Sequence, residues 1–537
     1  MICMRRSRPI ELADAKGAGR LDHEVCYRAV LARGGRYDGT FFTAVRTTGI
    51  FCRPICPTRP PRAENAIFFS TAAAAHAAGF RPCLRCRPDI APELAQWTES
   101  GVIARAMALI GSGCMQGAGL HEVAVRLGLG ERKLRLLFRE HFGASPKKIA
   151  AARRALLAKQ LVADTPLAMA DVARASGFGS LRSCSNVLGR SFGRPMRELR
   201  RCRTGPAGAL AVELTLAYKP PYDWPAMIGF LRARAIPGVE RVTADGYARS
   251  IALDGASGTI FVCPDPHRDA LHVTVRFPNL GSVPAILNRI RNAFDLGADP
   301  AVIDPHLARD PGLARLVAAR PGMRVPGAWD GFEIAVRAIL GQQITVRAAS
   351  LLAGRLASRY GEVLPAVEGL APAERSQLFP RPEQIAGADG LDRAIGMPKS
   401  RAAAIVSLAK AVAADPALLA PGPGLDESVA RLAGLPGIGQ WSAHYIAMRV
   451  LREPDAFPAA DVGLLRAMAS AEGRPSPRQL LARAASWRPW RAYAVMHLWT
   501  SEAALAACGN AGTKRAHESL SRTRPVADRH DPAGFRR

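Results

Sequence analysis

The sequence Leu435-Pro-Gly-Ile-Gly-Gln440 lies between two stretches with helical periodicity and reads apolar-Pro-Gly-apolar-Gly. Glycines in such a turn let backbone amides approach a phosphate closely, and the N-terminus of the following helix supplies a partial positive charge. The pattern predicts a helix-hairpin-helix whose DNA-binding turn consists of Leu435, Pro436, Gly437, Ile438 and Gly439. Alone, this element indicates only DNA binding without sequence preference.

One aspartate follows this turn at an informative distance. Asp461, in Phe457-Pro-Ala-Ala-Asp461, stands 22 residues after Gly439. An isolated aspartate is usually a helix cap or a surface charge. At this distance from such a hairpin it resembles the signature of base-excision glycosylases, which makes Asp461 the candidate catalytic carboxylate.

The composition of the whole chain favours nucleic acid as a partner. The 537 residues are enough for three or four domains, and 73 basic against 45 acidic side chains leave a formal charge of +28. Residues 1–205 contribute 34 basic and 15 acidic groups, a net +19, and residues 206–537 contribute 39 and 30, a net +9. The balance excludes an acidic disordered protein; an arginine-rich proteome is the alternative explanation.

Other features indicate the compartment. No apolar run reaches the roughly 18 residues of a membrane span. The start, Met1-Ile-Cys-Met-Arg-Arg6, lacks the apolar segment of a secretory signal. Eleven cysteines are an odd number and too few for a disulfide scaffold. We therefore expect a cytoplasmic protein with no membrane contact.

Composition divides the chain into segments that are typical of a multidomain α+β protein. Aromatic extended stretches come first, a helical Ala-, Leu- and Arg-rich segment follows, alternating strands appear next, and helical periodicity then returns. The expected segments are a basic lead 1–20, a small α/β domain 21–95, an all-α module 100–203, a linker 204–208, a β-rich subdomain 209–283, a helical domain 284–506 and a disordered basic tail 507–537.

The all-α segment contains an internal repeat. The pattern from Leu120 to Gly130 recurs from Met169 to Gly179, and each copy is a helix, a glycine-containing turn and a second helix, as in a helix-turn-helix. The second helices would present Glu131, Arg132, Lys133 and Arg135 in one copy and Ser180, Leu181, Arg182 and Ser185 in the other. Two copies in a basic segment favour major-groove binding over a helical bundle with a solvated charged face.

Four cysteines form two short pairs, Cys52-Arg-Pro-Ile-Cys56 and Cys83-Leu-Arg-Cys86. Such spacings bring four sulfurs around a tetrahedral zinc ion. Four unligated thiols are the weaker alternative, and a purely structural zinc is the stronger one. Seven arginines near these pairs are expected to hold a phosphate backbone against the metal: Arg46, Arg53, Arg59, Arg62, Arg81, Arg85 and Arg87.

These residues resemble a known family. Val45–Cys56 and Gly79–Cys86 are similar to the N-terminal domain of Ada adaptive-response proteins, over about 75 residues. The resemblance implies one zinc ion held by Cys52, Cys56, Cys83 and Cys86. It also implies that Cys52 accepts a methyl group from a DNA phosphotriester.

The helical segment extends the likeness to the AraC-type DNA-binding module that follows in Ada proteins. Phe142-Gly-Ala-Ser-Pro146 and Phe192-Gly-Arg-Pro195 resemble the ends of its two units. Cys184 and Leu188 stand where the family usually has aromatic residues, which predicts a less tightly packed second unit. The Pro-Cys-His-Arg motif of Ada's own C-terminal part does not occur.

Residues 209–506 resemble AlkA-type alkylpurine glycosylases. The matching stretches are Pro220–Trp224, Tyr247–Ser250, Arg337–Gln343, the hairpin and Trp487–Tyr493. The likeness implies a β-rich subdomain and two helical subdomains with a cleft between them.

The same likeness implies the roles of individual residues. Asp461 would stabilise an oxocarbenium-like sugar and help the attacking water. Gln343 would fill the space left by the flipped nucleotide, and Trp441, Tyr445 and Trp499 would line the pocket for a cationic alkylated base. The likeness also allows a monovalent cation at the hairpin.

A lysine two residues after the hairpin's second glycine marks bifunctional relatives, and this chain has Trp441 there. No lysine occurs between Lys410 and Lys514. We therefore expect a monofunctional enzyme that leaves an abasic site. Val462 follows Asp461 where some relatives have tyrosine, which predicts a different pocket shape and substrate range.

Together these features predict a fused adaptive-response protein, monomeric, that acts on double-stranded DNA at lesions and promoters, with RNA polymerase as a further partner. One alternative is a transcription regulator whose glycosylase half only binds DNA. Another is a repair enzyme whose N-terminal half is a passive zinc-bearing clamp.

Overall fold

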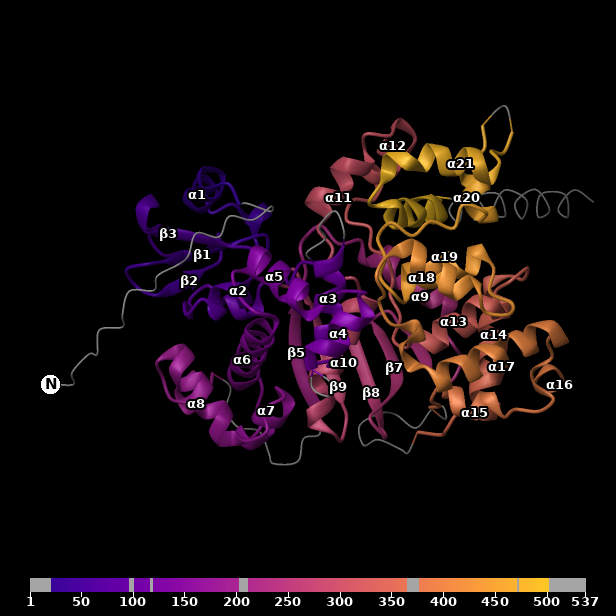
Figure 1. Cartoon of the computed structure of the whole chain (residues 1–537), viewed down its shortest axis with the longest axis horizontal. Coiled ribbons are helices and arrows are strands. Elements are labelled where there is room, and N and C mark those ends of the chain that lie inside the picture. Colours follow the sequence, from indigo (N-terminus) through magenta and orange to yellow (C-terminus); the bar gives the residue numbers. More distant parts are fainter. Residues whose placement is uncertain are drawn as a thin grey trace, which may run out of the picture.

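The computed structural model describes residues 21–95, 101–115, 119–201, 211–364, 376–470 and 473–501. The predicted lead, linker and tail (1–20, 204–208 and 507–537) lie outside these residues. Figure 1 shows the described part as a row of modules, from a small sheet at the N-terminal end to a large group of helices at the C-terminal end. No helix in this part is long and apolar enough to cross a membrane. The predicted multidomain α+β class is confirmed.

The N-terminal module is a four-stranded sheet with strand order β3-β1-β2-β4. Its elements are α1 (His23–Leu31), β1 (Phe42–Val45), β2 (Ile50–Cys52), β3 (Ala66–Phe69), α2 (Ala72–Ala77) and β4 (Arg81–Pro82). Phe42 and Phe51 meet edge to face in its core, with ring centroids 6.2 Å apart. Because β4 pairs parallel to β2, the C-terminal ends of both strands lie at the same edge of the sheet. The cysteine-bearing turns leave from that edge.

Six helices form the second module, and they confirm the predicted pair of helix-turn-helix units. They are α3 (Val102–Gly111), α4 (Gly119–Arg126), α5 (Glu131–Phe142), α6 (Pro146–Asp164), α7 (Met169–Ala175) and α8 (Leu181–Phe192). The turn glycines Gly128 and Gly177 have φ of +65° and +78°, which explains the repeated glycine. Cys184 and Leu188 are fully buried.

The predicted β-rich subdomain is a five-stranded antiparallel sheet with strand order β5-β9-β8-β7-β6. Its elements are β5 (Ala211–Ala217), α9 (Trp224–Arg234), β6 (Glu240–Val242), β7 (Tyr247–Leu253), β8 (Ala256–Pro264) and β9 (Ala270–Arg276), followed by α10 (Val283–Ala293). On β5, the inward residues Val212, Leu214 and Leu216 alternate with more exposed ones.

Helices make up the C-terminal module around the buried helix α13 (Gly331–Leu340). The other helices are α11 (Pro300–Leu307), α12 (Pro311–Ala319), α14 (Val346–Tyr360), α15 (Pro382–Ala386), α16 (Leu391–Ile395), α17 (Lys399–Ala414), α18 (Leu425–Ala433), α19 (Gln440–Arg449), α20 (Val462–Ala467) and α21 (Pro477–Arg483). Helix α13 contacts α14, α17 and α19, so apolar residues surround it on nearly all sides.

The modules are not packed independently, because some of them share one apolar core. One continuous apolar cluster joins residues of α6, α7 and α8 to the five-stranded sheet and α10. Figure 1 shows α6 beside β5, where Gln160 Nε2 donates to the carbonyl of Thr215 (2.9 Å). The second helix-turn-helix unit is therefore packed on the β-rich subdomain.

A buried ionic cluster joins the N-terminal module to α6. Lys159 Nζ lies 2.7 Å from Asp89 Oδ1, and both side chains are almost completely buried. Arg87 donates to both carboxylate oxygens of Asp164 at 2.7 Å and to Asp89 at 2.9 Å. A buried charge must be paired, because desolvation otherwise destabilises the folded state. Arg87 directly follows Cys86, so this cluster fixes the cysteine turn against α6.

We expect Lys159→Met to destabilise the protein by about 1.5–3 kcal/mol, because the buried Asp89 carboxylate loses one charged hydrogen bond and keeps only its contact with Arg87. Chemical denaturation of the zinc-loaded chain measures the effect. Arg174→Met removes an exposed ion pair with Asp171 on α7 and serves as the matched control, with an expected change of about 0–1 kcal/mol. Equal changes in the two variants would contradict the assignment.

Candidate metal centre and active site

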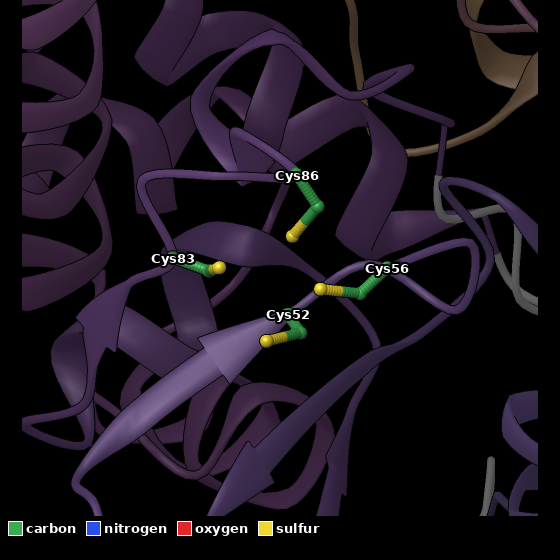
Figure 2. Close-up of side chains that lie close together, drawn as sticks. All are labelled: Cys52, Cys56, Cys83 and Cys86. Atoms are coloured by element: carbon green, nitrogen blue, oxygen red, sulfur yellow. The ribbon is translucent and has the colours of Figure 1, made fainter. Parts of the chain in front are cut away.

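The four predicted cysteine ligands converge at the edge of the first sheet. Cys52 ends β2, Cys83 follows β4, and Cys56 and Cys86 lie in the turns that come next. All four Sγ atoms lie within 4.8 Å of one another (Figure 2). A tetrahedral zinc with Zn–S bonds of about 2.3 Å requires S–S separations of about 3.8 Å. The donor set therefore fits one zinc ion, as the sequence predicted.

The four sulfurs are not equivalent. The backbone N–H of Arg53 donates to Cys86 Sγ (3.4 Å), and Thr58 Oγ1 lies 3.0 Å from Cys56 Sγ. Hydrogen bonds of this kind withdraw negative charge from a thiolate. Cys52 is the half-exposed member of the set, and Cys56, Cys83 and Cys86 are buried. Cys52 is therefore the most accessible of the four cysteines.

Two of the seven arginines expected to contact phosphate have another role. Arg53 forms an ion pair with Asp38 and donates to the carbonyl of Cys86 (3.3 Å), and Arg87 belongs to the buried cluster with Asp164. The expectation is wrong for these two, because buried guanidinium groups paired with carboxylates are not available to DNA. The other five arginines are exposed: Arg46, Arg59, Arg62, Arg81 and Arg85.

Asp461 is held by three hydrogen bonds. It caps the N-terminus of α20, accepting from the N–H of Leu464 at 2.9 Å. The indole N–H of Trp499 donates to the same oxygen, Oδ1, at 3.0 Å, and the indole N–H of Trp441 donates to Oδ2 at 2.8 Å. The sequence predicted these tryptophans only as aromatic lining; that they orient the carboxylate depends on tertiary structure.

An aromatic stack extends from this carboxylate. Trp441 and Tyr445, one helical turn apart on α19, are stacked with centroids 5.4 Å apart and an interplanar angle of 13°. Tyr445 lies 6.2 Å from Trp499, which stacks on Phe230 at 6.5 Å. Phe230 belongs to α9 of the β-rich subdomain. Phe230 could not be identified from the sequence, because no local pattern links α9 to α19.

Positive charge lies behind the stack. Arg449 donates to Tyr445 Oη at 2.6 Å, and the guanidinium groups of Arg234 and Arg449 lie 3.8 and 4.9 Å from the Phe230 ring centroid. Burial by itself raises the pKa of Tyr445, but Arg449, Arg234 and Arg337 bring this pKa below its ordinary value. Arg449 follows Tyr445 by four residues on α19, so helical spacing could have identified it.

Gln343 lies in the exposed turn between α13 and α14, with a φ of +57° that is rare for a residue with a side chain. Its neighbour Gln342 donates to the carbonyl of Gly437 (2.9 Å) and to Ser442 Oγ (3.1 Å). Arg401 donates to the carbonyl of Gln342 (2.7 Å). The residue before the predicted wedge is therefore tied to the hairpin, and Gln343 itself stays exposed.

The hairpin itself joins α18 to α19, as predicted. Gly437 has a φ of +78°, and a Cβ at this position would lie 2.3 Å from Ala404 Cβ on α17. Gly439, in contrast, has open space above it at the N-terminus of α19. Ile438 is buried, and Pro436 and Gly439 are exposed. The first glycine is required by packing, and the second leaves room for an approaching ligand.

Fold and sites together define a protein that combines a zinc-thiolate module, a double helix-turn-helix and a helix-hairpin-helix base-excision domain. Family models match the corresponding parts. They are the metal binding domain of Ada (25–89), a helix-turn-helix domain (123–202), the AlkA N-terminal domain (213–330) and the HhH-GPD superfamily of base excision DNA repair proteins (336–492).

The chain is 40% identical over 488 residues to a probable bifunctional transcriptional activator/DNA repair enzyme AlkA of Mycobacterium tuberculosis, covering 89% of this chain and 96% of the relative. It therefore belongs to this family of bifunctional transcriptional activator/DNA repair enzymes. DNA-3-methyladenine glycosylase 2 of Escherichia coli is 37% identical over 290 residues, 54% of this chain and 97% of that protein. The Escherichia coli Ada protein is 51% identical over 74 residues, 14% of this chain and 21% of that protein.

We expect Trp441→Phe and Trp499→Phe each to lower single-turnover base excision by about 10- to 100-fold, because each removes one hydrogen bond to a charged group while keeping an aromatic ring. Excision from a duplex carrying 3-methyladenine, together with equilibrium DNA binding, measures the effect.

Trp490→Phe is the matched control, since the Trp490 ring packs edge-on against Tyr493 in the same domain. DNA affinity should stay within about twofold in all three variants. Full excision activity in both Trp441→Phe and Trp499→Phe would show that the indole N–H groups are dispensable.

Proposed function

We propose that this chain performs two reactions on alkylated DNA, hydrolysis of the glycosidic bond of alkylated purines at Asp461 and methyl transfer from a phosphotriester to Cys52. The supporting observation for the first is one carboxylate oriented by two indole N–H groups at the end of an aromatic stack. The domain limits expected from composition, such as 21–95 and 284–506, are part of this proposal.

Excision needs little acid catalysis when the base is already cationic. N-alkylation gives the purine a positive charge, which the faces of Trp441, Tyr445 and Trp499 attract and which makes the base a good leaving group. Asp461 stabilises the developing positive charge on the sugar and orients the attacking water. Gln343 occupies the space that the flipped nucleotide leaves in the duplex.

The Cys52 reaction is a direct displacement. Cys52 Sγ forms a bond to the methyl carbon, the bond from that carbon to the phosphotriester oxygen breaks, and the phosphodiester leaves as an anion. Zinc, when bound, keeps the thiols deprotonated at neutral pH. The half-exposed position of Cys52 supports it as the acceptor, with Cys56, Cys83 and Cys86 as the remaining ligands.

Methylation changes the charge of the zinc centre. Four thiolates around Zn²⁺ carry a formal −2, and methylation of one sulfur leaves −1, which weakens repulsion from DNA phosphates. The double helix-turn-helix then binds promoter DNA through α5 and α8, whose residues Arg132, Lys133 and Arg182 are exposed.

The remaining parts of the proposal depend on the family likeness. They are a monomeric protein in a reducing cytoplasm, RNA polymerase as a partner of the activator, and a monovalent cation bound by hairpin carbonyls.

Two substitutions separate the reactions. We expect Cys52→Ala to abolish transfer of labelled methyl to the protein while leaving excision within about twofold of wild type. Asp461→Asn should do the reverse, with a loss of excision of at least about 100-fold. One assay on methylated DNA that scores released bases and protein-bound methyl measures both. Retained excision of 3-methyladenine in Asp461→Asn would overturn the catalytic assignment.

The glycosylase is expected to be monofunctional. Trp441 occupies the position of the catalytic lysine, so no amine there can form a Schiff base with the sugar. Borohydride treatment during turnover should therefore trap no covalent protein–DNA adduct, and the product should be an intact abasic site. A trapped adduct would refute this prediction.

A further inference from the structure

Arg105, on the helix that precedes the first helix-turn-helix unit, reaches into the glycosylase domain. It lies on α3, and its guanidinium group donates to both carboxylate oxygens of Glu453, from Nε at 2.6 Å and from Nη2 at 3.1 Å. Nη1 donates to the carbonyl of Pro423 at 2.9 Å. One side chain thus contacts two segments of the other half of the protein.

These two segments are the open ends of the helix-hairpin-helix. Pro423 stands just before α18 begins at Leu425, and Glu453 stands four residues after α19 ends at Arg449. The hairpin closes the pair of helices at one end, and Arg105 bridges the chain at the other.

The ion pair is buried, so its loss would leave Glu453 as an unpaired buried charge. Arg105 is 7% exposed and Glu453 is 3% exposed. A bidentate guanidinium–carboxylate pair is a strong and directional contact, and a buried carboxylate left without its partner is strongly destabilising. Glu453 would then turn toward solvent, and its segment of the chain would have to move.

Short turns connect Glu453 to Asp461. The N–H of Ala456 donates to the carbonyl of Glu453 (3.2 Å), and the N–H of Asp461 donates to the carbonyl of Pro458 (2.9 Å). Between these turns, the N–H of Phe457 donates to His444 Nδ1 of α19 (3.3 Å). A displacement at Glu453 is therefore transmitted to the carboxylate that Trp441 and Trp499 orient.

The helix-turn-helix unit supports this contact with apolar packing. A Cβ at Gly128, the turn glycine of the first unit, would lie 3.3 Å from Pro423 Cγ. Ala420, in the same loop before α18, packs against the apolar core of that unit.

We infer that Arg105 is a positioning residue for base excision. It holds the two open ends of the helix-hairpin-helix together, so that the helical module containing α3 completes the active site of the glycosylase domain. This inference rests on Asp461 acting as proposed above.

The test compares full-length, zinc-loaded variants. Arg105→Met and Glu453→Gln are each expected to lower the single-turnover rate of 3-methyladenine excision by about 10- to 100-fold, since small displacements of a catalytic group have effects of this size. DNA affinity and methyl transfer to Cys52 should remain within about twofold. Glu362→Gln, which removes an exposed ion pair with Arg381 in the same domain, is the matched control and should keep the wild-type rate.

The double variant Arg105→Met/Glu453→Gln distinguishes a pair from two separate effects. If the two residues act together, the double variant should be no less active than the less active of the two single variants. Additive losses, or wild-type excision in Arg105→Met, would overturn the inference.

Methyl transfer and thermal unfolding report whether each variant is folded. If Arg105→Met does not fold, Glu453→Gln and Arg105→Lys decide the question, because wild-type excision in both would also overturn the inference. Retained excision in Asp461→Asn would instead refute the proposed function, so the two failures are distinguishable.

Discussion

The two hydrogen bonds from indole N–H groups to the Asp461 carboxylate set the precision that the C-terminal half must achieve. Their donors come from two helical segments separated by 58 residues in sequence, and the acceptor caps a third, α20. Distances of 2.8 and 3.0 Å between such groups require a rigid frame. The buried helix α13 supports one of these segments, α19, and also contacts α14 and α17.

The two candidate sites handle charge in opposite ways. At the zinc centre, a formally negative cluster lies among exposed arginines, and its proposed reaction removes one negative charge. At the excision site, one carboxylate stands before an aromatic stack with Arg234 and Arg449 behind it. Both arrangements suit contact with a polyanion. The proposed reaction changes the charge of the zinc centre permanently, whereas the charge of the excision site is the same before and after turnover.

Much of this arrangement could be predicted from the sequence, because short motifs encode it. The cysteine spacings, the repeated glycine turns and the hairpin led to the correct modules. The sequence could not show that Trp441 and Trp499 orient Asp461, or that Phe230 joins their stack. It also misassigned Arg53 and Arg87, which stabilise the fold. In each case the deciding partner belongs to another element of the chain, and no local periodicity indicates it.

The core shared by α6–α8 and the five-stranded sheet has an evolutionary consequence. Composition marks a boundary near residues 204–208, but the apolar packing continues from one side of it to the other. Encoding the halves as two separate genes would divide this common cluster and expose apolar surface on both. Such a fusion is easier to retain than to reverse, because reversal needs several polar substitutions at once.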